Sequence, residues 1–184
     1  MQIVLVRHAK VLIENQNSTS ANEMNRWVEE YNHAPIDSTL PKNEVVSLIQ
    51  NSNYKIVSSL YRTEASLSLL KIEAHEKNSL FDEIDLPQTK GTWLKLKPKM
   101  WLMTLRIVML IGFGKKEKVL KEAKQRAKEA SLYLQKSAKE HDSVTLLGHG
   151  GFNYLLDKEL KKLGFRCVEK KSSSKNWGYR IYES

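Results

Sequence analysis

Arginine and histidine side chains stand at three places where a short apolar run has just ended. Arg7 and His8 follow the first run. Arg62 stands a few residues beyond the second run, and His149 follows the third. Such runs are typical of buried strands, and ligands of open α/β sheets bind beyond the carboxyl ends of the strands. Two arginines and two histidines gathered there suit phosphoryl transfer through histidine, because guanidinium groups neutralise phosphoryl oxygens while an imidazole nitrogen attacks phosphorus.

This chemistry also requires a neutral imidazole and a proton donor. Neighbouring arginines lower the pKa of a histidine, because a like charge disfavours the protonated ring, whereas a bound phosphate dianion acts in the opposite direction. A carboxylic acid must protonate the leaving alcohol. The densest acidic cluster of the chain offers Asp82, Glu83 and Asp85 for that role. No carboxylate or cysteine stands at metal-site spacing beside the histidines, so we expect neither a metal nor another cofactor.

The elements that must position these side chains alternate along the sequence. The predicted strands are 3–7, 54–59, 143–147, 165–169 and 177–182, and the predicted helices are 20–31, 42–50, 60–76, 115–141 and 152–163. Residues 80–87 are expected to form a brief strand or an extended segment. The alternation indicates an α/β fold, a three-layer α/β/α sandwich with a mainly parallel central sheet, in which the strand ends converge on one crevice.

The region from 91 to 114 is the most unusual part of the chain. Three lysines precede the apolar run 101–113, which is too short to span a membrane. A core or capping helix is therefore expected there. The flanking lysines and Trp101 leave peripheral membrane contact through 95–113 as the alternative.

The composition bounds the partners and the compartment. The 184 residues are 41% hydrophobic, enough for one domain with a real core, and the net charge of +9 favours anionic partners. Much of this charge lies in 115–128, a solvated helix face without interleaved aromatics, so we expect no nucleic-acid binding. Cys167 is the single cysteine, which excludes an internal disulfide and fits a reducing compartment. Strand-like sequence begins at residue 2, so no signal peptide is expected and the location is predicted to be cytoplasmic.

Three motifs resemble those of the histidine phosphatase superfamily, also called phosphoglycerate-mutase-like. Residues 5–9 (LVRHA) resemble its Arg-His-Gly signature, and 58–66 (SSLYRTEAS) resemble its Ser-x-Leu-x-Arg-Ala-x-x-Thr motif. Residues 148–151 (GHGG) resemble its Ser-His-Gly-Gly motif, and the order and spacing of all three match. The resemblance implies a single histidine-phosphatase domain over 1–184 with a phosphoglycerate-mutase-like fold. It also implies that the chain is a phosphatase-type member of branch 1. The helical insertion at about 91–114 is less characteristic of the family.

The resemblance also implies a role for each matching residue. His8 would be the nucleophile that becomes phosphohistidine. Arg7, Arg62 and His149 would hold the phosphoryl group. Glu83, which follows a Leu-Phe-Asp lead, would be the general acid, with its two acidic neighbours in the cluster as alternatives.

The chain departs from the family pattern at a few positions of these motifs. Ala9 replaces the usual glycine and Gly148 replaces a frequent serine, and neither change removes a catalytic group. Lys10 stands where the family often has glutamate. This lysine is a further candidate for substrate binding, because substrate preference is expected where the loop leaves the pattern.

The expected function is a metal-independent phosphatase that hydrolyses small phosphomonoesters through a phosphohistidine intermediate at His8. One alternative is a protein-phosphohistidine phosphatase of the short signalling type, which usually lacks an insertion like 91–114. The other is a catalytically silent phosphate-binding or membrane-surface module. A phosphoglycerate mutase is less expected, because such enzymes are usually longer.

Overall fold

The computed structural model describes residues 1–13, 17–85, 94–111 and 115–184, and it describes 106–111 and 115–117 by their backbone alone. Within these ranges a sheet of six strands runs in the order β3-β2-β4-β1-β6-β5. The strands are β1 (Gln2–Arg7), β2 (Tyr54–Val57), β3 (Glu76–Lys77), β4 (Ser143–Gly148), β5 (Arg166–Lys171) and β6 (Tyr179–Glu183). The first four in spatial order are parallel, β6 is antiparallel to β1, and β5 is antiparallel to β6.

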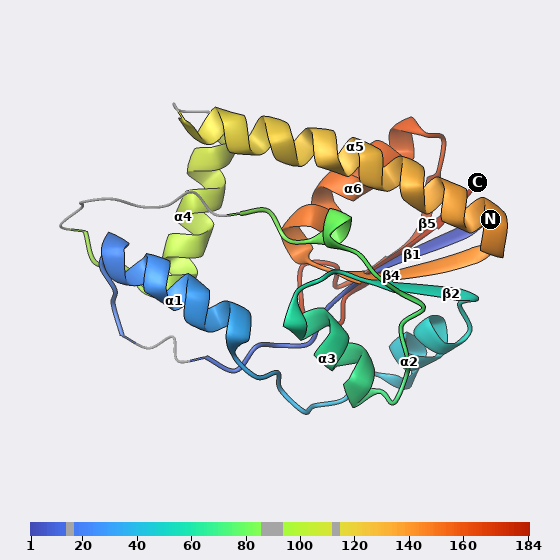
Figure 1. Cartoon of the computed structure of the whole chain (residues 1–184), viewed down its shortest axis with the longest axis horizontal. Helices are drawn as coiled ribbons and strands as arrows, with labels where there is room; N and C mark the ends of the chain where they lie inside the picture. The colour runs from blue at the N-terminus through green and yellow to red at the C-terminus, as the bar shows by residue number, and fades with distance from the viewer. Residues whose placement is uncertain (14–16, 86–93, 112–114) are drawn as a thin grey trace.

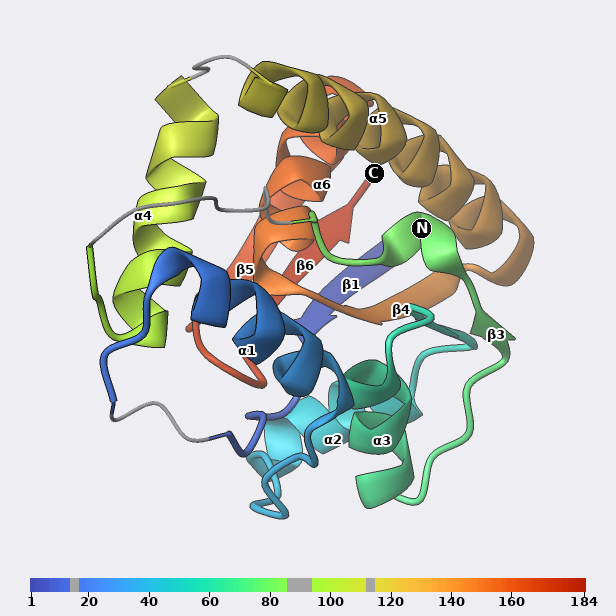
Figure 2. The same cartoon turned by 60° about the vertical axis from the view of Figure 1, so that its left-hand side comes forward.

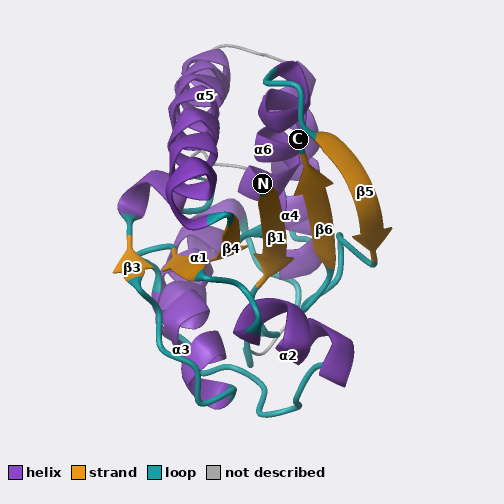
Figure 3. Ribbon diagram, turned by 90° about the vertical axis from the view of Figure 1, so that its right-hand side faces the viewer, coloured by secondary structure: helices purple, strands orange, loops and turns teal. Residues whose placement is uncertain are grey.

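Helices cover both faces of this sheet. One layer contains α5 (Lys115–His141) and α6 (Gly150–Lys162), and the other contains α2 (Asn43–Gln50) and α3 (Tyr61–Leu69) (Figures 1 and 3). Because successive side chains of a strand point to opposite faces, a strand covered on both sides is apolar throughout. Ile3 and Leu5 accordingly pack in the core under α5 and α6, whereas Val4 and Val6 pack in the core with α2 and α3. The expected three-layer sandwich with a mainly parallel centre is confirmed.

Two further helices lie side by side beyond the sheet, at the end toward which β1 runs (Figures 1 and 2). They are α1 (Ala21–His33), whose capping box at Ser20 and Glu23 matches the expected start, and α4 (Pro98–Ile111), which belongs to the predicted insertion. Trp101 Nε1 donates a hydrogen bond to the Thr19 carbonyl oxygen at 2.8 Å. The buried side chains that join the two helices form a separate core cluster of Ala21, Met24, Trp27, Trp101 and Leu105.

The ends of the predicted insertion, 91–93 and 112–114, lie outside the described residues. Within the described ranges, no helix combines the length and the apolarity that crossing a membrane requires.

The carboxyl end predicted for the helix over 60–76 was wrong. α3 stops at Leu69, because Lys71 adopts a positive φ of 57° and the backbone closes the helix with two bonds. Ile72 N–H donates to Leu67 O at 3.1 Å, and Lys71 N–H donates to Ser68 O at 3.0 Å, which is the Schellman pattern. Glycine is the usual residue at this position, and Gly164 does mark the end of α6 as expected. With lysine at this position, the sequence lacks the glycine that usually indicates the end of a helix.

The segment that follows α3 also differs from the prediction. The short strand is β3, which precedes the acidic cluster, and the cluster itself follows a 3₁₀ helix, η1 (Ser79–Phe81). The Asn78 side chain caps η1 by accepting from Leu80 N–H at 2.9 Å. Residues 86–87 of the predicted segment lie outside the described residues.

Leu134 tests the packing of α5 on the sheet, because its side chain is 0% exposed in the main core. We expect Leu134→Ala to lower the free energy of unfolding by about 2–5 kcal/mol, since it removes buried methyl groups and leaves a cavity. Equilibrium urea denaturation measures this change. Leu132→Ala is the matched control on the same helix, because Leu132 is 46% exposed. Its effect should stay within about 0.5 kcal/mol, and an equal loss in both variants would contradict the packing described here.

Candidate active site

The register of the parallel strands aligns the carboxyl ends of β1, β4 and β2, which the predicted site residues follow. Val6 of β1 pairs with Leu147 of β4, which pairs in turn with Val57 of β2. The residues that follow these rows therefore leave the sheet beside one another. His8 and His149 accordingly lie close together, with 5.2 Å between their ring centroids.

His8 is held with one ring nitrogen committed to the backbone. Its side chain is buried, and Nδ1 lies 2.6 Å from the Ala9 carbonyl oxygen. A carbonyl oxygen only accepts hydrogen bonds, so Nδ1 carries the proton of the neutral ring. The lone pair then resides on Nε2, which is the nitrogen able to attack phosphorus.

The electrostatic surroundings keep the His8 ring neutral. Burial is the largest cause and, with the nearby charges of Arg62 and Arg7, lowers the pKa of His8 from 6.5 to about 3, although the bond to Ala9 acts in the opposite direction. The two arginines were expected to act this way from the sequence. The larger effect of desolvation becomes visible only in the folded chain.

His149 connects the second arginine to the end of β2. Arg62 Nε donates to His149 Nδ1 at 3.3 Å, so Nδ1 is the acceptor and Nε2 carries the proton. Nε2 in turn donates to Ser58 Oγ at 2.6 Å. Burial is the largest cause and, with the nearby charges of Arg62, Arg7 and Arg126, lowers the pKa of His149 well below its usual value. His149 is therefore neutral and has both ring nitrogens in hydrogen bonds within the protein.

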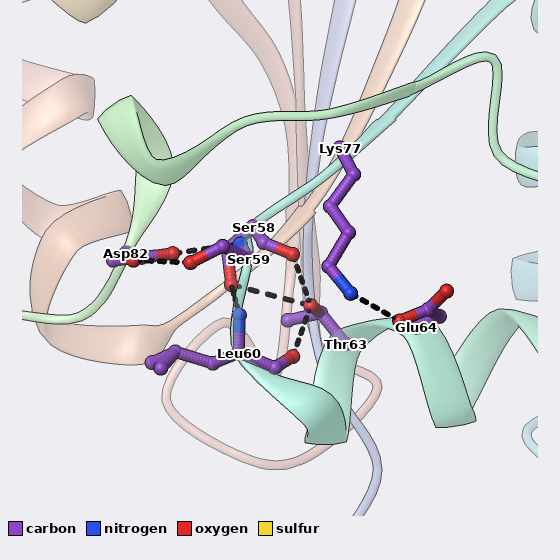
Figure 4. Close-up of polar contacts among 7 residues, drawn as sticks. All are labelled: Ser58, Ser59, Leu60, Thr63, Glu64, Lys77 and Asp82. Carbon is purple, nitrogen blue, oxygen red and sulfur yellow. Dashed lines mark hydrogen bonds and ion pairs between the residues drawn. The ribbon is translucent and has the colours of Figure 1, made fainter.

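The turn between β2 and α3 is fixed by its own polar side chains (Figure 4). Thr63 Oγ1 lies 2.8 Å from the Leu60 carbonyl oxygen and 3.0 Å from that of Ser58. Ser59 donates to Asp82 twice, from its backbone N–H at 2.7 Å and from its hydroxyl at 2.6 Å. Asp82 therefore ties this turn to the acidic segment, and the turn delivers the arginine that begins α3.

Arg7 and Arg62 both line the same cavity as His8. Arg62 is only 3% exposed, its Nη1 donates to Asn32 Oδ1 at 3.0 Å, and its guanidinium lies 5.2 Å from the centre of the Tyr31 ring. Arg7 Nη1 donates to the Ser174 carbonyl oxygen. Burial is the largest cause that lowers the pKa of Arg62, so this guanidinium is incompletely compensated and favours an anionic ligand.

Glu83 sits at the amino end of α6. Its carboxylate accepts from Gly151 N–H at 3.2 Å and from Phe152 N–H at 2.9 Å. A Cβ atom on Gly151 would lie 2.6 Å from Glu83 Oε1, so a larger residue there would require the Glu83 carboxylate to shift. Arg126 of α5 fixes the same segment, because it donates to the carbonyl oxygens of Asp82 at 2.8 Å and Glu83 at 3.2 Å and lies 4.3 Å above the Phe152 ring.

These groups surround a cavity of about 280 Å³. Of the residues predicted for the site, Arg7, His8, Arg62 and Glu83 line it, together with Asp82 and Asp85. His149 lies behind this lining with a fully buried side chain. The rest of the lining is largely apolar and comes from the helices and from the segments before α3 and after η1: Trp27, Val28, Tyr31, Asn32, Leu60, Ile84, Leu102, Leu120, Gly151, Tyr154 and Leu155.

Lys10 does not line this cavity. Its side chain is exposed, and Nζ lies 3.8 Å from Asp37 Oδ2. Its predicted contact with substrate stays a prediction. Among the described residues, no group of three or more His, Cys, Asp or Glu side chains is placed to hold a metal ion.

Sequence reasoning missed three residues that support the site. Ser58 was part of a recognised motif, and its position at the end of β2 could have suggested a contact with His149. Asn32 and Arg126 carry no local signal, because the groups they hold are distant in the sequence.

The structure explains one departure from the family pattern. A Cβ atom on Gly148 would lie 2.8 Å from Asn153 Oδ1. Asn153 itself donates from Nδ2 to the Val6 carbonyl oxygen at 3.2 Å and so links α6 to β1. A serine at position 148 would require Asn153 to move.

Comparison with known proteins shows the fold. No protein-family model and no curated protein matches the sequence. A phosphoserine phosphatase from Entamoeba histolytica, solved in complex with 3-phosphoglyceric acid, is 13% identical with a TM-score of 0.53, and the match covers 98% of this chain and 89% of that one. Mycobacterial hydrolase 2 is 15% identical with a TM-score of 0.53 over 88% and 72% of the two chains. Mycobacterial hydrolase 1 is 13% identical with a TM-score of 0.50 over 98% and 87%. These likenesses confirm the phosphoglycerate-mutase-like fold expected from the motifs.

The lowered pKa of His8 predicts how stability depends on pH. The folded-state pKa of about 3 lies below the ordinary 6.5, so between these values the unfolded chain binds a proton that the folded chain does not. The free energy of unfolding should therefore fall as the pH is lowered from 6.5 toward 3, by up to about 1.4 kcal/mol per pH unit for this group. His149 contributes in the same direction.

Urea denaturation at several pH values in phosphate-free buffer measures this slope, because a bound phosphate would stabilise the protonated ring. His8→Asn should flatten the slope by up to about 1.4 kcal/mol per pH unit. His33→Asn is the control, since His33 is exposed at the end of α1. An unchanged slope in His8→Asn would contradict the neutral, buried state of His8.

Proposed function

We propose that this chain is a metal-independent phosphatase of the histidine phosphatase superfamily, which hydrolyses small phosphomonoesters through a phosphohistidine at His8. The observation that carries the proposal is the state of His8. Its ring is buried and neutral, its Nδ1 is tied to Ala9 O, and it shares a cavity with two guanidinium groups. The phosphatase and hydrolase structures that share the fold support the same reading.

In the first step, His8 Nε2 attacks phosphorus in line with the ester oxygen. The N–P bond forms as the P–O bond to the alcohol breaks, and Glu83 supplies the proton that the departing oxygen needs. The phosphorylated ring gains positive charge, which the bond from Nδ1–H to the Ala9 carbonyl oxygen stabilises.

In the second step, water attacks phosphorus from the side that the alcohol has left. The Glu83 carboxylate takes a proton from this water, the N–P bond breaks, and inorganic phosphate departs. His8 regains its neutral ring with the lone pair on Nε2. Glu83 is protonated again, so the enzyme is ready for the next ester.

The two arginines neutralise the phosphoryl oxygens in both steps. His149 contributes through Arg62, because its Nδ1 accepts from the Arg62 Nε and its Nε2 donates to Ser58. These bonds orient the guanidinium before the substrate arrives, and such preorganisation reduces the cost of reaching the transition state.

His8→Ala tests the nucleophile. We expect hydrolysis of p-nitrophenyl phosphate in the presence of EDTA to fall by at least about 10³-fold, because the variant lacks the attacking nitrogen. Rapid acid-free quenching should also trap an alkali-stable, acid-labile phosphoenzyme in the wild type and none in the variant. His75→Ala is the control, because His75 is exposed and lies outside the cavity lining. Activity that survives His8→Ala would refute the mechanism, and inactivity of the wild type on all phosphomonoesters would favour a binding module.

Glu83→Gln tests the general acid through the leaving group. A p-nitrophenolate leaves without a proton, whereas an alkoxide requires one, so the variant should lose about 10²–10⁴-fold in phosphorylation rate on alkyl phosphates and much less on p-nitrophenyl phosphate. Single-turnover kinetics separate this step from hydrolysis of the phosphoenzyme. The amide retains an oxygen that can accept from Phe152 N–H.

Asp82→Asn and Asp85→Asn are the matched comparisons. Asp82 binds Ser59 with both oxygens, so its loss should affect both kinds of substrate together by disturbing the turn before Arg62. A loss confined to alkyl phosphates in either aspartate variant, but not in Glu83→Gln, would move the acid role to that residue.

A further inference from the structure

The wall of the cavity beyond the two arginines is apolar and comes from four helices. Trp27 and Tyr31 of α1 stack on each other with 5.3 Å between their ring centroids. Leu102 of α4, Leu120 of α5 and Leu155 of α6 also line the cavity. An alcohol bound beside the phosphoryl group would therefore contact aromatic rings and aliphatic side chains.

The charges around this wall disfavour a second negative group on the substrate. Among the described lining residues, the only cationic side chains are Arg7 and Arg62, and a phosphoryl dianion at His8 engages both. The same lining contains the carboxylates of Asp82, Glu83 and Asp85. A carboxylate or second phosphate on the alcohol would find no further cation among the described lining residues, and a desolvated, unpaired charge is strongly unfavourable.

The size of the cavity limits the substrate to a small molecule. Its volume of about 280 Å³ lies just below the usual range for small-molecule sites, which is about 300–1,000 Å³. α1 and α4 narrow it from one side, and their amino ends are joined where Thr19 and Leu96 exchange backbone hydrogen bonds at 2.9 and 3.1 Å. The cavity is therefore of a size that suits a small phosphoester.

We propose that the substrate is a small phosphomonoester of a neutral, apolar alcohol, alkyl or aryl, and that the α1–α4 wall selects against alcohols that carry a carboxylate or a second phosphate. This inference rests on the proposed function and adds the class of alcohol to it. The phosphoserine phosphatase that shares the fold, solved with 3-phosphoglyceric acid, acts on ligands of the opposite class by its name. The proposal therefore assigns this chain a different class of substrate from the one that names that neighbour.

A matched pair of substrates tests the proposal. Hexyl phosphate and its ω-carboxy analogue have the same reacting bond and a similar chain, and they differ in charge at the far end. We expect kcat/KM for hexyl phosphate to exceed that for the carboxy analogue by about 10- to 100-fold, mostly through KM. Phosphoserine and 3-phosphoglycerate should be as poor as the carboxy analogue.

Two variants on one helix connect this preference to the wall. Leu102→Lys places a cation in the lining, so it should reduce the preference for hexyl phosphate by about tenfold or more. Met103→Lys is the control, because Met103 is 58% exposed and is not among the lining residues. It should leave the preference unchanged. Far-UV circular dichroism and thermal melting verify that each variant folds.

The outcomes separate the inference from the proposed function. If the alkyl, aryl and carboxylate-bearing phosphomonoesters all resist hydrolysis, the proposed function fails, whereas hydrolysis of phosphoserine or 3-phosphoglycerate in preference to hexyl phosphate overturns the apolar class alone. If hexyl phosphate and its carboxy analogue are hydrolysed equally well through His8, the function stands and the apolar class is overturned. A preference for phosphocholine over hexyl phosphate also overturns it, because the carboxylates rather than the apolar wall would then select the alcohol. The substrate pair on the wild type decides the question even if Leu102→Lys does not fold.

Discussion

The hydrogen bond between His8 Nδ1 and the Ala9 carbonyl oxygen determines which nitrogen of the ring is able to react. It forms because the chain leaves β1 in a conformation that three distant segments hold in place. Gly148 O accepts from His8 N–H at 3.1 Å, Asn176 donates to His8 O at 2.9 Å, and Ser66 accepts from Ala9 N–H at 2.9 Å. A two-residue stretch is thus fixed from β4, from α3 and from the loop before β6. Preorganised groups of this kind need no rearrangement when charge develops on the ring.

The buried cations give the site its preference for an anion. Arg62 keeps its charge among Asn32, Tyr31 and His149, but burial outweighs these contacts and lowers its pKa. The pKa of His8 and that of His149 are lowered for the same combination of reasons. All three shifts reflect positive charge in a region with little water, and a phosphoryl dianion relieves that condition directly. The sheet positions these side chains, and their burial away from water strengthens the interactions between their charges.

The two carboxylates of the acidic segment after η1 contact different elements. Asp82 faces Ser59 and stabilises the turn before α3, whereas Glu83 faces the free N–H groups at the start of α6. Arg126 holds the backbone of both residues from α5, so the segment is anchored to helices on the same face of the sheet. The helix pair α1 and α4 then covers the remaining side of the cavity with apolar side chains. Under the proposed mechanism, the phosphoryl group and the alcohol would therefore contact different parts of the fold.

The alternation of elements could be predicted from the sequence, because strand period, capping boxes and apolar stripes are local signals. The sequence placed α5 within its observed bounds and located His8, His149 and Arg62 beyond strand ends, since a parallel sheet brings such ends to one edge. It did not show that α3 ends at Lys71, because a lysine with positive φ carries no local mark. The folded chain was needed to establish the tautomer of His8, the separate positions of Asp82 and Glu83, the position of Lys10 outside the cavity lining, and the contacts of Asn32 and Arg126. Each of these depends on how a side chain packs against a segment distant in the sequence, and such contacts have no periodicity from which they could be predicted.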